Sequence, residues 1–273
     1  MVWIWILMIL LAAAGLWLYL IAPALSRPKA LAQLHRHQYA HRGLHDIKNG
    51  VPENSLLAFS LAAEQGFAIE LDVHISKDGA LVVEHDDTLQ RTCGSDLTIE
   101  ENDWETIKDL RLEGTKERLP LLKEVLELID GRVPLLIEAK VAKGSHNRLA
   151  KALFEMLKEY QGPYCIESFD PRPLLWFRKN APEVVRGQLA AHVRKDGAKV
   201  SGIVDFALSN LLVNLISRPH FIAYGYKDYK NPSLAICRLL FRSPLFFWTV
   251  RDKEAATLCK RKNAAPIFEQ MIP

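Results

Sequence analysis

The sequence predicts an α/β protein: a TIM-type (β/α)8 barrel with a small insertion, preceded by one N-terminal transmembrane helix. Short apolar runs rich in β-branched or aromatic residues alternate with helical patterns, which is typical of βα units around a parallel sheet. The chain has 273 residues, so the part after its first apolar segment is close to the ~250 residues of one barrel. A composition that is 49% hydrophobic and 25% charged suits a globular protein with a large core.

The N-terminal segment, residues 1–26, is predicted to be a transmembrane anchor. It contains no charged side chain, and ~20 apolar residues are enough to cross a bilayer. The alternative is a secretory signal peptide that is cleaved near Ala22-Pro23-Ala24. The anchor is favoured because no basic residue precedes the apolar run, which is also longer than the ~7–15 residues of the apolar region within a signal peptide.

Basic residues follow the segment and predict its orientation. The chain carries Arg27, Lys29, Arg36 and Arg42 before its first acid, Asp46. The positive-inside bias therefore predicts a single-pass membrane protein with its main domain on the cytoplasmic side. Residues 27–37 are expected to be a basic, solvated linker with some attraction to anionic lipid, so membrane lipid is an expected partner of this end of the chain.

Nine runs within residues 38–273 are strand candidates, although a barrel needs eight. They are Tyr39–Arg42, Ala68–Val73, Ala80–Glu84, Pro134–Lys140, Tyr164–Ser168, Val185–Ala190, Phe221–Tyr226, Phe246–Val250 and Ala265–Phe268. Lys77-Asp78-Gly79 is a turn signal between the second and third runs. One βα unit is therefore expected to have a hairpin in place of its helix.

Helical patterns fall between these runs. Asn54 is a candidate cap for a helix over Ser55–Gln65, and Thr98 begins a capping-box pattern before Ile99–Asp109. Apolar residues at helical spacing predict further helices over 122–129 and 149–157. The stretch 89–120 is too long for a plain loop and is predicted to be a small inserted subdomain at one end of the barrel.

Charge and cysteine content exclude some classes of function. The net charge of +3 is small and evenly spread, so no nucleic-acid partner is expected. The four cysteines, Cys93, Cys165, Cys237 and Cys259, have no CxxC spacing. Neither a zinc site nor a redox pair is therefore indicated, and reduced thiols fit the cytoplasmic side.

Acidic side chains on two strand candidates indicate a metal site. Glu70 and Asp72 lie two residues apart on an apolar strand, so both leave the same face, and burying two carboxylates without a cation is costly. Glu138 and Lys140 repeat this spacing, which offers a third carboxylate to a cation and a positive charge to a phosphate. Ligation by oxygen alone favours Mg²⁺ or Ca²⁺.

Two histidines end strand candidates and are expected at the same rim of the barrel. His41 ends the first run and His85 follows the third, so the pair can act as general base and general acid in the cleavage of a phosphodiester. Arg42 offers a planar fork for phosphate oxygens, and Gly43 allows the backbone to approach closely.

An ordered series of motifs resembles the glycerophosphodiester phosphodiesterase family over residues 38–250. The series is His41-Arg42-Gly43, Pro52-Glu53-Asn54-Ser55, Glu70-Leu71-Asp72-Val73, Lys77-Asp78-Gly79, His85-Asp86, Leu89-Gln90-Arg91-Thr92, Glu138-Ala139-Lys140, Ser168-Phe169-Asp170 and Trp248-Thr249-Val250. The order of so many motifs makes the resemblance far more specific than any one of them.

The resemblance implies metal-dependent hydrolysis of glycerophosphodiesters to glycerol phosphate and an alcohol. It implies that Glu70, Asp72 and Glu138 bind metal and that His41 and His85 form the acid/base pair. Arg42 and Lys140 would hold the phosphate, Glu53 would lie near the metal and the glycerol, and Trp248 would wall the pocket. The sequence departs from the family pattern at Ser55, usually Thr, and at residues 261–270, which lack a glycine-rich run ending in Thr-Asp, so the contribution of the last strand is open.

Two alternatives remain beside this hypothesis. An anchored barrel lies close to lipid, so the substrate could be a lysophospholipid, as for a lysophospholipase D. The apolar stretch Leu234–Phe247, which includes Arg238 and Arg242, could rest on a bilayer, although a packed helix and strand are favoured. The other alternative is a non-catalytic, membrane-tethered barrel that only binds a ligand.

Overall fold

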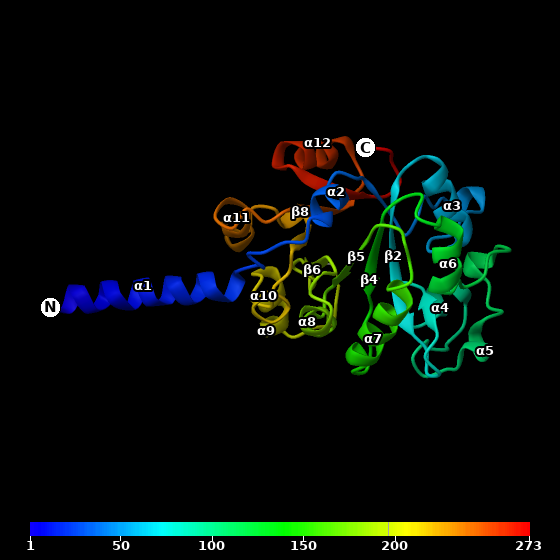
Figure 1. Ribbon diagram of the computed structural model, residues 1–273, viewed down its shortest axis with the longest axis horizontal. Helices are drawn as coiled ribbons and strands as arrows, with labels where there is room; N and C mark the ends of the chain where they lie inside the picture. Colours follow the sequence, from blue (N-terminus) through cyan, green and yellow to red (C-terminus); the bar gives the residue numbers. More distant parts are fainter. Residues whose placement is uncertain (196) are drawn as a thin grey trace.

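The computed structural model describes residues 1–195 and 197–273 and shows a barrel from which one long helix projects (Figure 1). In the described residues, eight parallel strands close the barrel because β1 pairs with both β2 and β9. The strands are β1 (Tyr39–His41), β2 (Ala68–Ile75), β4 (Leu135–Ala139), β5 (Tyr164–Ser168), β6 (Arg186–Ala190), β7 (Phe221–Gly225), β8 (Leu245–Val250) and β9 (Ala264–Phe268). The predicted barrel is confirmed.

The remaining strand explains why the sequence offers nine candidates. β3 (Leu81–Val83) pairs antiparallel with the end of β2, and the turn at Lys77-Asp78-Gly79 joins the two. β3 therefore extends β2 beyond the closed ring, as the predicted hairpin requires.

Helices surround the barrel (Figure 1). They are α1 (Val2–Ile21), α2 (Ala30–Leu34), α3 (Leu56–Glu64), α4 (Gln90–Cys93), α5 (Trp104–Ile107), α6 (Leu122–Ile129), α7 (His146–Leu157), α8 (Pro171–Asn180), α9 (Gly202–Ser209), α10 (Asn214–Ser217), α11 (Pro232–Leu239) and α12 (Lys253–Lys262). Short 3-10 turns are η1 (Ile47–Asn49), η2 (Leu112–Gly114) and η3 (Tyr226–Asp228). The helices expected over 122–129 and 149–157 are confirmed as α6 and α7.

Two helix predictions need correction. Ser55 caps α3 by accepting a hydrogen bond from the backbone N–H of Ala58, 3.1 Å away, so the predicted cap Asn54 is wrong. The helix expected over Ile99–Asp109 is also wrong, because only α5 forms in this part of the described chain. The hydroxyl of Thr98 donates to the side chain of Glu101 instead of capping a helix. Residues 89–120 hold α4, α5 and η2 around a small apolar cluster of their own.

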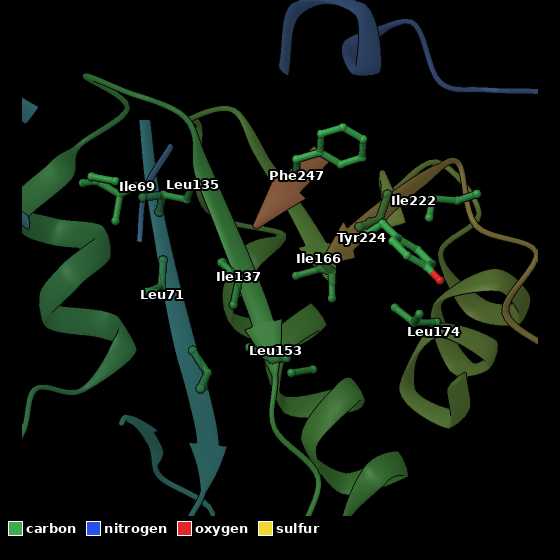
Figure 2. Packing of buried hydrophobic residues seen from close by; sticks show 14 of the residues in the cluster. Ile69, Leu71, Leu135, Ile137, Leu153, Ile166, Leu174, Ile222, Tyr224 and Phe247 are labelled. Atoms are coloured by element: carbon green, nitrogen blue, oxygen red, sulfur yellow. The ribbon is translucent and has the colours of Figure 1, made fainter. Parts of the chain in front are cut away.

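Alternation along the strands separates two cores. Outward side chains such as Ile69, Leu71 and Ile137 pack under the surrounding helices, and Figure 2 shows this layer with Leu153 of α7 and Leu174 of α8. Each such side chain contributes roughly 1.5–3 kcal/mol when it is fully buried. The inward residues between them, including Glu70 and Asp72, face the barrel axis.

The interior of the barrel is apolar at its N-terminal end. Leu31 and Leu34 of α2 are buried there with Tyr39 of β1 and Phe246 of β8. The hydroxyl of Tyr39 donates to the carbonyl of Leu34 at 2.8 Å. The prediction that residues 27–37 are a solvated linker is therefore wrong for α2, whose apolar side chains close the N-terminal end of the barrel. The charged groups lie at the opposite, C-terminal end.

The helix α1 projects away from the barrel for most of its length (Figure 1). Residues 1–16 are exposed, and burial begins at Trp17 and becomes complete at Ile21. The length and apolar composition of α1 are those of a membrane span, and they are shared with signal sequences.

Candidate active site

Parallel strand register brings the acidic residues into one layer at the C-terminal end of the barrel. His41 of β1 lies beside Glu70 of β2, and Asp72 of β2 lies beside Glu138 of β4. One carboxylate oxygen from each of Glu70, Asp72 and Glu138 lies within 4.8 Å of the others. All three side chains are buried, so the proposed metal ligands converge on one point.

Burial and mutual repulsion shift the pKa values of these acids. Burial, followed by the charges of Asp72 and Glu138, raises the pKa of Glu70 well above its usual value. Burial also raises the pKa of Glu138. For Asp72, burial acts in the same direction, but Lys140, His85 and Arg42 outweigh it and hold the pKa well below its usual value.

Two basic side chains partly neutralise the cluster. Nζ of Lys140 lies 3.4 Å from Oδ1 of Asp72 and 3.2 Å from Oε1 of Glu138. Nε of Arg42 lies 3.4 Å from Oδ2 of Asp72, and the backbone N–H of Arg42 donates to Glu70 at 3.0 Å. Three carboxyl groups therefore face two basic side chains in a buried place.

The residues fit a divalent cation. Oδ1 of Asp72 is buried and accepts no hydrogen bond from the described residues, and its ion pair with Lys140 is long at 3.4 Å, so this oxygen can still take a ligand. The side chain of Asn54 donates to the other oxygen, Oδ2, at 2.9 Å and so fixes the direction of the carboxylate. A set of donors made up of carboxylate oxygens alone suits a hard divalent cation.

His41 is held by an acid at the far end of the sequence. Its Nδ1 lies 2.7 Å from Oε2 of Glu269, which directly follows β9, and Nε of Arg251 lies 3.1 Å from Oε1 of the same carboxylate. Burial lowers the pKa of His41 to about 4, against the opposing effect of Glu269. Since a carboxylate only accepts, Nδ1 carries the proton and Nε2 is left for the cavity.

His85 is held in a matching way by its neighbour. Its Nδ1 lies 2.5 Å from Oδ1 of Asp86, and Nε of Arg91 donates to Oδ2 of Asp86 at 2.7 Å. The hydrogen bond from His85 lowers the pKa of Asp86. The buried carboxylate of Glu84 accepts the backbone N–H groups of His85 and Asp86, which fixes this short segment.

Glu53 links the two halves of the site. Its Oε1 accepts from Nη1 of Arg42 at 2.8 Å and from Nη2 of Arg91 at 2.7 Å. The result is a continuous chain that begins with the hydrogen bond between His85 and Asp86 and continues through ion pairs from Asp86 to Arg91, Glu53 and Arg42. In the structure, Glu53 is a bridge between two arginines beside the acid cluster, and its predicted contact with metal and glycerol stays a prediction.

A cavity of about 550 Å³ opens above these groups, which is a size that suits a small ligand. The predicted residues that line it are His41, Arg42, Glu70, His85, Glu138 and Trp248. Trp248 packs edge to face against Phe169 with ring centroids 5.5 Å apart, so together they form an apolar wall. Asp72, Lys140 and Glu53 contact this set from behind and beside it.

Several residues of the site were not among the predicted ones. Glu269, Asn54, Asp86 and Arg91 orient predicted residues, and Glu167 adds a further buried carboxyl whose pKa is raised by burial. The register of β4 and β5 places Glu167 beside Glu138. Asn54, Asp86 and Arg91 belong to the motif series, so the sequence contained a signal for these three residues. Glu167 and Glu269 could be identified only from the strand register and from the closure of the sheet.

Residues 41–269 match the model of the glycerophosphoryl diester phosphodiesterase family. The chain belongs to this family. The resemblance seen in the motif series is therefore confirmed, and the match extends through the last strand.

Curated relatives of this family member carry related names. A glycerophosphodiester phosphodiesterase of Caldanaerobacter subterraneus subsp. tengcongensis is 39% identical over 162 residues, which are 55% of this chain and 65% of the relative. The human lysophospholipase D GDPD1 is 34% identical over 121 residues, covering 40% of this chain and 37% of that protein. The alignments thus span less than two thirds of the length of these relatives.

Solved structures share the fold over nearly their whole length. The phosphodiesterase of Oleispira antarctica, in complex with the product sn-glycerol-3-phosphate, gives a TM-score of 0.71 at 23% identity and covers 87% of this chain and 94% of its own. The glycerophosphodiester phosphodiesterase of Thermotoga maritima gives 0.64 at 26% identity, with 84% and 92% covered. Both support the barrel assignment.

Proposed function

We propose that this family member is a membrane-anchored, metal-dependent phosphodiesterase that hydrolyses glycerophosphodiesters to glycerol phosphate and an alcohol. The observation that carries the proposal is the convergence of three buried carboxylates and two carboxylate-held imidazoles on one cavity. Family membership and the names of its relatives support the same activity.

In this proposal Glu70, Asp72 and Glu138 hold the divalent cation, Mg²⁺ or Ca²⁺. When bound, such an ion supplies positive charge to phosphoryl oxygens and lowers the pKa of a hydroxyl group. Arg42 and Lys140 lie beside the same acids and stabilise the charge that builds up on the phosphorus centre. The apolar wall of Trp248 and Phe169 shields the reacting groups from water.

The two histidines perform the proton transfers. One accepts the proton of the attacking hydroxyl, which belongs to water or to the glycerol next to the ester, and the other donates a proton to the leaving alkoxide. Glu269 and Asp86 each engage Nδ1, so Nε2 of each ring is available for the transfer. Glu269 offsets part of the cost that burial places on the imidazolium form of His41, and Asp86 holds the ring of His85 in a defined orientation.

The experiment incubates the full-length protein in detergent micelles with glycerophosphocholine, glycerophosphoethanolamine and lysophosphatidylcholine, each with Mg²⁺, with Ca²⁺ and with a chelator. We expect metal-dependent release of choline or ethanolamine from the first two substrates. Absence of turnover with all three substrates and both metals would favour the non-catalytic binding barrel.

A lysophospholipase D-type activity is the second candidate. It is favoured by the long exposed helix α1 and by the similarity to the human lysophospholipase D GDPD1. Faster turnover of lysophosphatidylcholine than of glycerophosphocholine in the same assay would assign the acylated substrate.

The proposed arrangement in the cell is an anchor at residues 1–26, a linker at 27–37 and a cytoplasmic barrel at 38–273 that includes the insertion 89–120. The exposed apolar residues of α1 and the basic residues that follow support it. Protease treatment of intact and opened spheroplasts tests it: the barrel should be cleaved only after opening.

A further inference from the structure

We propose that the barrel itself rests on the lipid bilayer through α9 and the end of α11, on the side from which α1 projects. The inference rests on the proposed anchor and goes beyond it. An anchor alone would leave the orientation of the barrel relative to the bilayer free. Contact through α9 and α11 would fix that orientation.

The length of α1 gives the first argument. Its exposed part, residues 2–16, is about 22 Å long at 1.5 Å per residue, whereas the hydrocarbon core of a bilayer is ~30 Å thick. The last turn of α1 is therefore needed to complete the span. Because that turn already packs against the barrel, the groups that contact it must lie at the level of the bilayer boundary.

The contacts of this last turn identify those groups. Trp17 packs edge to face against Phe206 of α9, with ring centroids 6.3 Å apart. The carbonyl of Ile21 accepts hydrogen bonds from Asn214 of α10 at 2.7 Å and from the thiol of Cys237 of α11 at 3.3 Å. Side chains and backbone thus clamp the end of α1 between these helices, and Figure 1 shows all three at its base.

Large apolar side chains on the clamping helices are exposed. On α9, Ile203 is 82% and Phe206 is 52% exposed, and at the end of α11, Leu239 is 66% and Leu240 is 61% exposed. Exposed apolar side chains that are grouped in this way often mark a contact with a partner or a membrane. Within the stretch Leu234–Phe247, most residues belong to the packed elements α11 and β8. The bilayer contact suggested for this stretch is therefore limited to Leu239 and Leu240.

Groups typical of a membrane boundary border the surface. Nη1 of Arg218 donates to the carbonyls of Tyr19 and Ala22, and its guanidinium lies 4.8 Å from the centroid of the Tyr19 ring. Trp17 and Tyr19 lie in the same turn. Aromatic rings and arginine at the end of an apolar helix are the usual composition of the interface between lipid and water.

Two residues of the cavity wall lie in the segments that precede these helices. Lys195, in the loop between β6 and α9, and Tyr226, between β7 and α11, line the cavity. Tyr226 thus precedes α11, whose other end carries Leu239, and Lys195 lies on the α9 side of the cavity.

Depth-dependent fluorescence quenching tests the proposal without using activity. The full-length protein with Cys93→Ser, which removes the one half-buried thiol and leaves three buried ones, receives a single environment-sensitive label at Ile203→Cys or Leu239→Cys. Leu10→Cys in the middle of α1 reports insertion of the anchor. Ile47→Cys is the control, because Ile47 is 44% exposed on η1 and lines a groove with Leu61 of α3, a helix on the side of the barrel away from α1 (Figure 1).

The labelled proteins are reconstituted into vesicles of phosphatidylcholine and phosphatidylglycerol that contain spin-labelled lipids. The spin label is near the headgroup for the proteins labelled at position 203, 239 or 47, and near the end of the acyl chain for the protein labelled at position 10, which lies at the middle of the span. We expect the labels at Ile203 and Leu239 to lose most of their emission and the label at Ile47 to retain it. If Leu10 is quenched but either surface position behaves as Ile47 does, the anchor stands and the resting surface is wrong. If Leu10 is not quenched, the anchor and this inference fail together. A blue-shifted label at Ile203 that lipid does not quench would mean that a protein covers the face, which also overturns the inference.

Discussion

Nδ1 of His41 lies 2.7 Å from Oε2 of Glu269, although the two residues are 228 positions apart in the chain. The pairing joins the first barrel strand to the end of the last one. Glu269 can therefore orient the imidazole of His41, a proposed acid/base group, only when the barrel is closed. Glu269 occupies the end of the strand whose contribution the sequence left open.

The first prediction concerns Glu269 as a positioning residue. In Glu269→Gln, the amide can present its N–H₂ group to Nδ1 and so favour the wrong tautomer of His41, which has lowered kcat by up to about 10⁴-fold in a comparable pair. We expect kcat for glycerophosphocholine to fall at least about 100-fold, with a much smaller change in KM and a shifted pH profile.

The matched control for Glu269 is Glu254→Gln, which changes an exposed acid on α12. It should behave as the unsubstituted protein. If Glu269→Gln changed only the melting temperature and left kcat and the pH profile intact, the role of Glu269 would be structural.

The second prediction concerns the two histidines. We expect His41→Ala and His85→Ala each to lower kcat by about 10²–10⁴-fold, which is the usual contribution of a positioned acid or base. The double variant should be little worse than either single one, since groups that act as a unit are not additive. Circular dichroism should show an intact fold, and near-normal turnover by the double variant would refute the assignment.

The third prediction concerns the repulsion among the acids. Without metal, Glu70→Gln should raise the melting temperature, because it removes a buried carboxyl whose pKa is raised by burial and by Asp72 and Glu138. With Mg²⁺ or Ca²⁺, the unsubstituted protein should gain stability, about 2.7 kcal/mol at 100 times the Kd, and the variant should gain less.

Thermal unfolding with and without a chelator checks the metal prediction, and Glu64→Gln on the exposed face of α3 is the control. A variant that lost stability in the absence of metal, or that responded to metal as fully as the unsubstituted protein, would contradict the proposed ligand set.

The fourth prediction concerns Gly43, which follows Arg42. Its φ is +81°, and a Cβ built there would lie 2.8 Å from the carbonyl carbon of Ala58 in α3. The close approach that the sequence suggested is therefore made to a helix of the protein. Gly43→Ala should lose roughly 1–2 kcal/mol from the backbone conformation and a further 1–3 kcal/mol from the steric conflict.

Gly50→Ala separates these two effects. Gly50 also has a positive φ, +78°, but a Cβ added there would meet no atom within 4 Å, so only the backbone cost should appear. Urea unfolding of both variants measures the difference. Equal losses at the two positions would show that the contact with Ala58 relaxes at no cost.

The fifth prediction concerns pH and His220, far from the acid cluster. Its Nδ1 accepts the backbone N–H of Arg186 at 3.2 Å, and burial, followed by Arg186 and Arg27, lowers its pKa to about 3. Between pH 6.5 and about 3, the unfolded chain binds a proton that the folded protein does not. The free energy of unfolding should therefore fall as the pH is lowered through this range.

His220→Asn keeps a side-chain acceptor but does not titrate, so its stability should fall less steeply over the same range. Unfolding curves for the two proteins at pH 7, 6, 5 and 4 give the comparison. Parallel pH dependences would show that His220 does not contribute.

The sequence alone determined the barrel, its hairpin, the inward row of acids and the family. These features depend on local regularities: alternation along a strand assigns Glu70 and Asp72 to one face, and helical spacing identifies α6 and α7. The capping of α3 was displaced by one residue because Ser and Asn have similar capping tendencies, and only the contact of Asn54 with Asp72 separates them.

Only the tertiary structure decided which groups orient the site and which surfaces stay exposed. Glu269 reaches His41 because the sheet closes, Glu167 joins Glu138 through strand register, and α2 plugs the barrel because its apolar pair meets Tyr39 and Phe246. Such pairings join residues far apart in the chain, and their energies depend on distances that no local pattern encodes. The sequence specifies strands and helices through neighbouring residues, whereas the closed ring brings distant residues close enough to interact.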